Sequence, residues 1–163
     1  MLTAIQSRKE VERGAVLSAC HRYRYQLTRS WDGRLPTVAF VGLNPSTADA
    51  TLDDPTVRRC VGFARDWGFG TLMLVNLFAL RSPEPSKLYA AREPIGPEND
   101  HWLRLAGANA ETIVAAWGVH GELHGRGREV QRLFPHLKCL GKTREGHPRH
   151  PLYLSKHTPL EAF

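Results

Sequence analysis

Continuous apolar segments alternate along the chain with amphipathic ones, and this alternation predicts the secondary structure. Residues 21–31 alternate apolar or aromatic side chains with polar ones, which is typical of a half-buried strand. Four later segments are short, apolar and rich in β-branched side chains, and they comprise residues 37–43, 71–76, 111–117 and 137–140. Uninterrupted apolar segments of this length are typical of strands buried on both faces, as in a parallel sheet.

Helices are expected between these strands. Asp54 followed by Pro55 is typical of an N-cap and the first helical position, which predicts a helix from Pro55 to about Trp67. Two more helices are expected over residues 100–109 and 118–133. Strands that alternate with helices in this way are typical of β-α-β units.

The expected fold class is α/β. We expect a three-layer α/β/α sandwich with a small, mainly parallel four-stranded sheet and helices on both faces. Residues 1–163 form one domain, in which 1–36 are an N-terminal extension with a β segment. The proline-rich segment 81–99 is predicted to be a long connection with one short helical turn. The tail, 141–163, is predicted to be a loop with one helical turn.

Polar residues follow the predicted parallel strands. Ligands of open α/β sheets bind outside the carboxyl ends of the strands. The candidates there are Asn44, Pro45 and Ser46 after the first strand, Asn76 at the end of the second, and the residues of the C-terminal tail. The topology therefore predicts a site at one rim of the sheet.

Composition excludes several classes of protein. Hydrophobic residues make up 42% of the chain and charged residues 23%, which is typical of a globular domain rather than a disordered one. The longest apolar segments are far shorter than the roughly 20 residues of a membrane span, and the first residues lack the apolar core of a signal peptide. The three cysteines are widely separated, so we expect no disulfide framework, no cysteine metal site and a cytoplasmic location.

The charge of the chain favours an anionic partner. Lys and Arg number 22 against 16 Asp and Glu, which gives a net charge of +6, and most of the basic residues are Arg. Guanidinium groups match phosphate oxygens bidentately. We therefore expect nucleic acid or a nucleotide as the partner. We also expect no cofactor, no membrane and no obligate protein partner.

Four motifs in a fixed order carry a resemblance to a known superfamily. They are GLNPS at 42–46, VNLF at 75–78, IVAAWG at 113–118 and HPLYLSK at 150–156. This ordered set resembles the uracil-DNA glycosylase superfamily. The chain is also similar to a family of uncharacterised bacterial and phage domains that share the N-P-S-T-A-D loop and the H-P-L-Y tail.

The resemblance implies hydrolysis of an N-glycosidic bond to a nucleobase. Asn44 would position the attacking water, with Pro45 and Ser46 beside the substrate in the same loop. Asn76 would hydrogen-bond the edge of the base, because an amide offers one donor and one acceptor group. His150 would donate a hydrogen bond to the base oxygen that gains negative charge.

Other residues receive secondary roles. Phe78 could stack on the base, and core packing is its alternative. Leu152 and Tyr153 occupy the place of the loop that the resembled enzymes insert into a duplex. Asp49 could activate water if its loop folds back towards the site, and Arg81 could bind a phosphate.

Two further interpretations stay open. Ser46 and Leu152 replace the small Gly and Ser that are usual after N-P and H-P in the resembled enzymes, which favours a nucleic-acid or nucleotide-binding domain without catalysis. The segment HGELH places His120 and His124 four residues apart, as metal ligands on one helix face would be. It lacks a glutamate next to the first histidine, so a solvated helix face is the preferred interpretation and we expect no metal.

Overall fold

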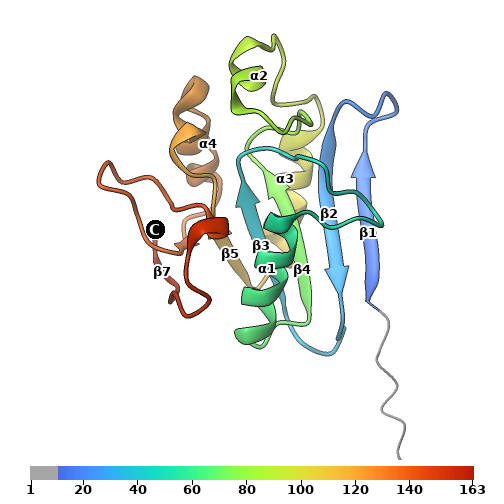
Figure 1. Cartoon of the computed structure of the whole chain (residues 1–163), viewed down its shortest axis with the longest axis vertical. Coiled ribbons are helices and arrows are strands. Elements are labelled where there is room, and N and C mark those ends of the chain that lie inside the picture. Colours follow the sequence, from blue (N-terminus) through green and yellow to red (C-terminus); the bar gives the residue numbers. More distant parts are fainter. Residues whose placement is uncertain (1–10) are drawn as a thin grey trace, which may run out of the picture.

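The computed structural model describes residues 11–163, which build one mixed sheet with helices on both faces (Figure 1). The strand order in the described part is β1-β2-β4-β3-β5-β6-β7. In chain order the elements are β1 (Glu12–Leu17), β2 (Arg24–Ser30), β3 (Thr37–Gly42), α1 (Pro55–Asp66), β4 (Thr71–Asn76), α2 (Pro85–Ala90), α3 (Asn99–Asn109), β5 (Thr112–Ala115), η1 (Val119–Gly125), α4 (Arg126–Leu133), β6 (Lys138–Cys139), η2 (Pro151–Tyr153) and β7 (Glu161–Ala162). The part of the expected N-terminal extension before residue 11 lies outside the described residues.

The α/β class is confirmed, but the sheet differs from the expected one. β3 pairs in parallel with β4 and β5, and β5 pairs in parallel with β6. The other three pairings, β1 with β2, β2 with β4 and β6 with β7, are antiparallel. The sheet is therefore seven-stranded and mixed rather than mainly parallel and four-stranded. β1 and β7 were not predicted, because β1 has only three consecutive apolar side chains, β7 has two residues, and the side chains of both strands are partly or fully exposed.

Two apolar layers hold the helices against the sheet. On one face, Val57, Cys60 and Phe63 of α1 pack with Val38 and Phe40 of β3. Successive side chains of a strand point to opposite faces, so the neighbouring residues of β3 join the other layer. That layer contains Ala39 and Val41 together with buried residues of α2, α3 and α4, namely Leu88, Leu103, Ala106 and Val130. Figure 1 shows α1 in front of the sheet and α3 behind it.

The start of α1 follows the sequence signal. Asp54 is the N-cap, and its Oδ1 accepts a hydrogen bond of 2.9 Å from the backbone N–H of Val57. This bond satisfies one of the amide groups that a helix leaves open at its N-terminus. Asp54 is thereby held at the carboxyl edge of the sheet.

The expected single helix over 118–133 is broken in two. His124 and Gly125 adopt positive φ angles of 56° and 64°, so the chain leaves helical geometry between η1 and α4. His120 and His124 therefore do not share one helix face.

No helix in residues 11–163 is long and apolar enough to cross a membrane.

Candidate functional site

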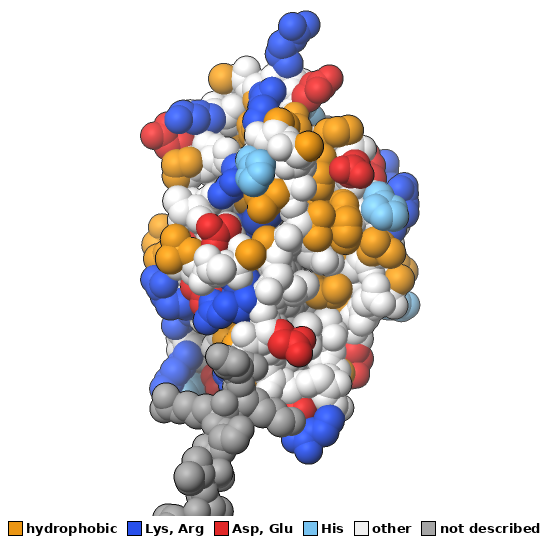
Figure 2. Space-filling view, turned by 90° about the vertical axis from the view of Figure 1, so that its right-hand side faces the viewer, with side chains coloured by type: hydrophobic (Ala, Val, Ile, Leu, Met, Phe, Trp, Pro, Cys, Tyr) orange, Lys and Arg blue, Asp and Glu red, His pale blue; other side chains and the backbone are white. Residues whose placement is uncertain are grey.

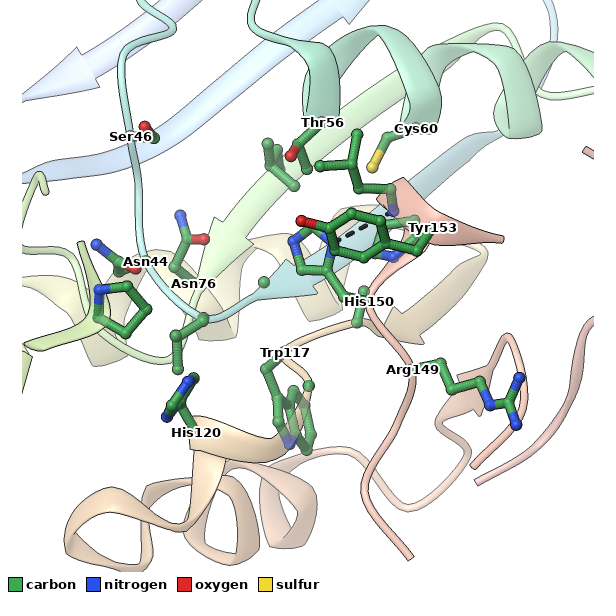
Figure 3. Close-up of a pocket in the computed structure, with 18 of the residues that line it drawn as sticks. Asn44, Ser46, Thr56, Cys60, Asn76, Trp117, His120, Arg149, His150 and Tyr153 are labelled. Atoms are coloured by element: carbon green, nitrogen blue, oxygen red, sulfur yellow. Dashed lines mark hydrogen bonds between the residues drawn. The ribbon is translucent and has the colours of Figure 1, made fainter. Parts of the chain in front are cut away.

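A cavity of about 710 Å³ opens at the carboxyl ends of β3, β4 and β5. Its walls come from the loop after β3, the first turns of α1, the segments after β4 and β5, and the C-terminal tail around η2 (Figure 3). The predicted site residues that line it are Asn44, Ser46, Asn76, His150, Leu152 and Tyr153. The structure thus brings together residues from five separate parts of the sequence, at the rim that the topology predicted.

Asn44 lines the cavity and also holds the surrounding loops together. Its Nδ2 donates to the backbone oxygens of Pro45, Leu80 and Ser82 at 3.1, 3.1 and 2.9 Å. These bonds fix the orientation of the amide, because only the nitrogen end can donate. Its Oδ1 is therefore the group left to accept a hydrogen bond from a bound water or ligand.

Asn76 presents a buried polar group without a partner. Its side chain is 3% exposed, and its Nδ2 has no hydrogen-bond partner within residues 11–163. Gly42, opposite it on β3, makes room for the amide, since a Cβ at Gly42 would lie 2.8 Å from Asn76 Oδ1. Buried donors in folded proteins nearly always have a partner. An unpaired amide in a cavity wall is accordingly typical of a ligand-binding group.

His150 is held as a neutral imidazole. Its Nδ1 accepts a hydrogen bond of 3.2 Å from the backbone N–H of Leu152, which is the dashed line in Figure 3. A nitrogen that accepts carries no proton, so the proton is on Nε2, which can donate. Burial lowers the pKa of His150, with Asp54 opposing this effect, and the lowered pKa keeps the ring neutral near pH 7.

Arg24, at the start of β2, is a site residue that the sequence analysis missed. It is 2% exposed, lines the cavity, and donates through Nη1 to the backbone oxygen of Ala48 at 2.6 Å. Its Nε has no hydrogen-bond partner in the described residues. Burial lowers the pKa of Arg24 to about 10, which Asp54 partly offsets, so the guanidinium is still charged at neutral pH.

Aromatic and apolar groups complete the cavity. Trp117 after β5 is 4% exposed and forms part of the wall. The Tyr153 ring is 86% exposed and lies 6.2 Å from the His150 ring, centroid to centroid. The thiol of Cys60 also lines the cavity, but burial raises its pKa far above the neutral range. Cys60 is therefore an apolar wall residue and not a thiolate nucleophile.

Four predicted site residues lie outside the cavity lining. Phe78 is fully buried in the core on the α3 side. The structure therefore supports core packing for Phe78 and not stacking on a base. Pro45 is also buried, and Arg81 donates a long bond of 3.5 Å to the backbone oxygen of His21. Asp49 accepts from the backbone N–H groups of Leu52 and Thr51, which lowers the pKa of its carboxyl group. The Asp49 carboxylate is thus engaged within its own turn.

The metal interpretation has no geometric support. Residues 11–163 contain no group of three or more His, Cys, Asp or Glu side chains that could hold a metal ion. His120 lines the cavity and its Nδ1 lies 3.2 Å from the hydroxyl group of Tyr89, whose ring meets the imidazole edge-on. His120 therefore forms part of the rim with an aromatic partner.

The sequence was compared with protein families, with curated proteins and with solved structures. It matches the family described as "Protein of unknown function (DUF1643)" over residues 24–152. The chain belongs to this family. The comparisons with curated proteins and with solved structures find no match.

The expected membership of an uncharacterised domain family is confirmed, while the resemblance to uracil-DNA glycosylases remains a prediction. The matched range begins at Arg24 and ends at Leu152, so it includes Asn44, Asn76 and His150.

Proposed function

We propose that this chain hydrolyses the N-glycosidic bond of a nucleobase bound in the cavity. The observation that carries the proposal is the unpaired Nδ2 of Asn76, a donor buried in the wall of a cavity that also holds the neutral His150. Two donors in one cavity suit a ligand with carbonyl oxygens, which most nucleobases have. A cavity of about 710 Å³ lies within the range typical of small-molecule sites.

The reaction needs charge stabilisation more than proton abstraction. The C1′–N bond breaks with its electron pair going to the base, which leaves an oxocarbenium-like sugar and a base anion. The Nε2–H of His150 would donate to the base oxygen on which that charge gathers. A neutral imidazole suits this role because its donor is fixed by the hydrogen bond at Nδ1.

Water then forms a new bond to C1′, and its proton passes to solvent or to the departing base. Asn44 Oδ1 would hold this water by accepting a hydrogen bond from it, since the amide nitrogen is engaged with three carbonyl oxygens. An amide does not take a proton as a carboxylate does, so Asn44 would position the water and no more. Modest rates would follow from such a site.

A binding domain without catalysis is the second candidate. The observation that favours it is the position of Asp49, whose carboxylate is held in its own turn and lies outside the cavity lining, away from a bound water. Oδ1 of Asp54, which lines the cavity, is likewise used as the cap of α1. This alternative predicts that a nucleotide or nucleic acid binds and is released unchanged.

The test is a screen for base release. Mononucleotides and single- and double-stranded oligonucleotides carrying uracil, hypoxanthine, xanthine or a modified pyrimidine are incubated with the protein. Free base is measured by chromatography, and abasic sites by alkaline cleavage. The expected result is release of one base, and binding without release would refute hydrolysis in favour of the second candidate.

Matched variants assign the release to the cavity. We expect Asn44→Ala and His150→Ala to lower the rate by about 10²–10³-fold, as the loss of a positioning or charge-stabilising group does. Asn109→Ala and His157→Ala change exposed residues of the same types outside the cavity and should leave the rate unchanged. Full activity in both cavity variants would overturn the proposed roles.

A further inference from the structure

Two arginines of β2 are almost fully buried, yet their surroundings differ. Arg29 is 1% exposed, and all three of its guanidinium nitrogens have partners. Its Nε donates to Asp53 at 2.8 Å, and Nη1 and Nη2 donate to backbone oxygens at 2.9 and 2.6 Å. Arg24 is 2% exposed, and within residues 11–163 its guanidinium makes one hydrogen bond, to the backbone oxygen of Ala48. Arg29 is therefore a structural residue with satisfied donors, and Arg24 is not.

The charge of Arg24 also lacks a direct counter-ion. Within residues 11–163 no carboxylate lies within 4.0 Å of its guanidinium, whereas Arg29 pairs with Asp53 at 2.8 Å. Asp54 acts on Arg24 from a longer distance, and the positive charges of Arg81 and Arg29 oppose that effect. A buried guanidinium with free donors and no ion pair is costly unless a ligand completes it.

A bulge in β2 turns Arg24 towards the cavity. β1 and β2 pair regularly up to Val16 opposite Gln26, and the next pair is Leu17 opposite Arg24, so Tyr25 is skipped. Leu27 belongs to the core on the α1 side, and strict alternation from Leu27 would place Arg24 on the other face. Bulges are common beside active sites, where they redirect a side chain.

The cavity wall beside Arg24 offers further groups to an anion. Ser46 and Thr56 line the same cavity, and their hydroxyl groups can donate. Asn76, the unpaired amide, lies in the same cavity at the end of β4. The cavity thus combines polar groups that can bind a nucleobase with a charged group that can bind an anion.

We propose that Arg24 binds the terminal phosphate of a free nucleoside monophosphate whose base lies against Asn76. The proposal rests on the function proposed above and narrows its substrate from nucleic acid in general to a mononucleotide. The guanidinium fork matches two oxygens of a phosphate. A phosphate inside a nucleic-acid strand is linked on both sides, so it could reach a side chain that is 2% exposed only if the strand entered the cavity. A terminal phosphate is linked on one side only, so it can enter the cavity without a strand following it.

The visible surface agrees with a small ligand. On the face shown in Figure 2, Lys and Arg side chains lie in separate groups with acidic side chains between them, and they form no continuous basic stripe. Proteins that track a nucleic-acid backbone present such a stripe. The buried Arg24 is therefore a stronger candidate for phosphate contact than the Lys and Arg side chains visible on this face.

The test compares each mononucleotide with its own nucleoside. Binding of uridine, inosine and xanthosine 5′-monophosphates, the three nucleosides, inorganic phosphate and a single-stranded oligonucleotide is measured by calorimetry on the full chain. We expect at least one monophosphate to bind about tenfold or more tightly than its nucleoside, as a buried charge-assisted contact requires. Equal affinities, tighter binding of the oligonucleotide, or no binding at all would each overturn the proposal.

Variants then locate the contact. Arg24→Gln should reduce the preference for the phosphate to about twofold, and Arg24→Lys should restore part of it. Arg29→Gln is the matched control, since it should lower the melting temperature and leave the preference intact. A preference retained in Arg24→Gln would refute the assignment. The comparison in the unmodified chain stands even if a variant does not fold.

The outcomes separate this proposal from the hydrolysis proposed above. Phosphate preference without release of free base would support Arg24 as the anion site and refute hydrolysis. Base release from oligonucleotides without binding of any monophosphate would support hydrolysis and refute the mononucleotide. Binding and base release are both measured with the same mononucleotides and oligonucleotides.

Discussion

Replacing Asn76 by leucine should stabilise the protein and abolish ligand binding at the same time. The Asn76 side chain is 3% exposed and its Nδ2 has no partner within residues 11–163. A buried donor left unpaired costs about 1–3 kcal/mol, and leucine of similar size removes that cost. We expect the free energy of unfolding to rise by about 1–2 kcal/mol, which corresponds to roughly 2–8 °C in melting temperature for a domain of this size.

The measurement is chemical unfolding followed by circular dichroism, together with thermal scans, on the wild type and Asn76→Leu. Ligand binding and base release are measured on the same preparations. Stability gained with function lost is typical of binding sites, because they keep polar groups that only a ligand satisfies.

Asn99→Leu is the matched control, since Asn99 is also buried but is used by the fold. Its Nδ2 donates to the backbone oxygens of Asn76 and Leu77 at 2.9 and 3.0 Å. Leucine removes both bonds; the backbone oxygen of Leu77 still accepts from Nε of Arg126 at 2.9 Å, but the backbone oxygen of Asn76 loses this donor, which should lower the free energy of unfolding by about 1–2 kcal/mol. The two substitutions of buried asparagine should therefore have opposite signs.

One result would refute the reasoning directly. If Asn76→Leu is less stable than the wild type by more than about 1 kcal/mol, the amide serves the fold and its unpaired nitrogen is no sign of a ligand. If the variant is stable and still binds or hydrolyses the substrate, Asn76 does not contact the ligand.

Two further predictions concern the groups around Asn76 and His150. The pKa of His150 is lowered in the folded protein. Below about pH 6.5 the imidazole is therefore protonated in the unfolded chain but still neutral in the folded one, so the free energy of unfolding should fall as the pH falls towards the folded pKa. Urea unfolding between pH 5 and 7.5 checks this, and a pH dependence that is unchanged in His150→Ala would contradict it. Gly42→Ala would place a Cβ 2.8 Å from Asn76 Oδ1, so we expect ligand binding to weaken and stability to fall by about 1–3 kcal/mol. Gly62→Ala is its control, because a Cβ there meets nothing within 4 Å and should stabilise the helix by about 0.5–1 kcal/mol; equal effects of the two substitutions would argue against a tight fit at Gly42.

Local sequence signals predicted the central elements well. The apolar segments at 37–43 and 71–76 became β3 and β4, and Asp54 and Pro55 begin α1 as expected. These elements were predictable because burial on both faces needs continuous apolar residues, and because a cap depends on residues three apart in the sequence. The candidate rim followed from the same reasoning, since parallel strands end at one edge.

Other features depend on contacts between distant residues. β1 and β7 are held by pairing with neighbours, and their apolar segments are too short to indicate a strand. The break between η1 and α4 depends on positive φ angles at His124 and Gly125, which helical periodicity does not reveal. Phe78 and Asp49 looked suitable for the site, yet one is packed in the core and the other caps its own turn.

Sequence alone predicted an α/β core with Asn44, Asn76 and His150 near the carboxyl ends of its strands, because Asn44 follows one predicted strand, Asn76 ends another and His150 lies in the tail after the last one. Only the tertiary structure showed that Arg24 joins them. Regular alternation along β2 places Arg24 on the opposite face from Leu27, and the bulge at Tyr25 reverses that placement. A bulge is decided by how two strands pair, and pairing is a property of the folded chain.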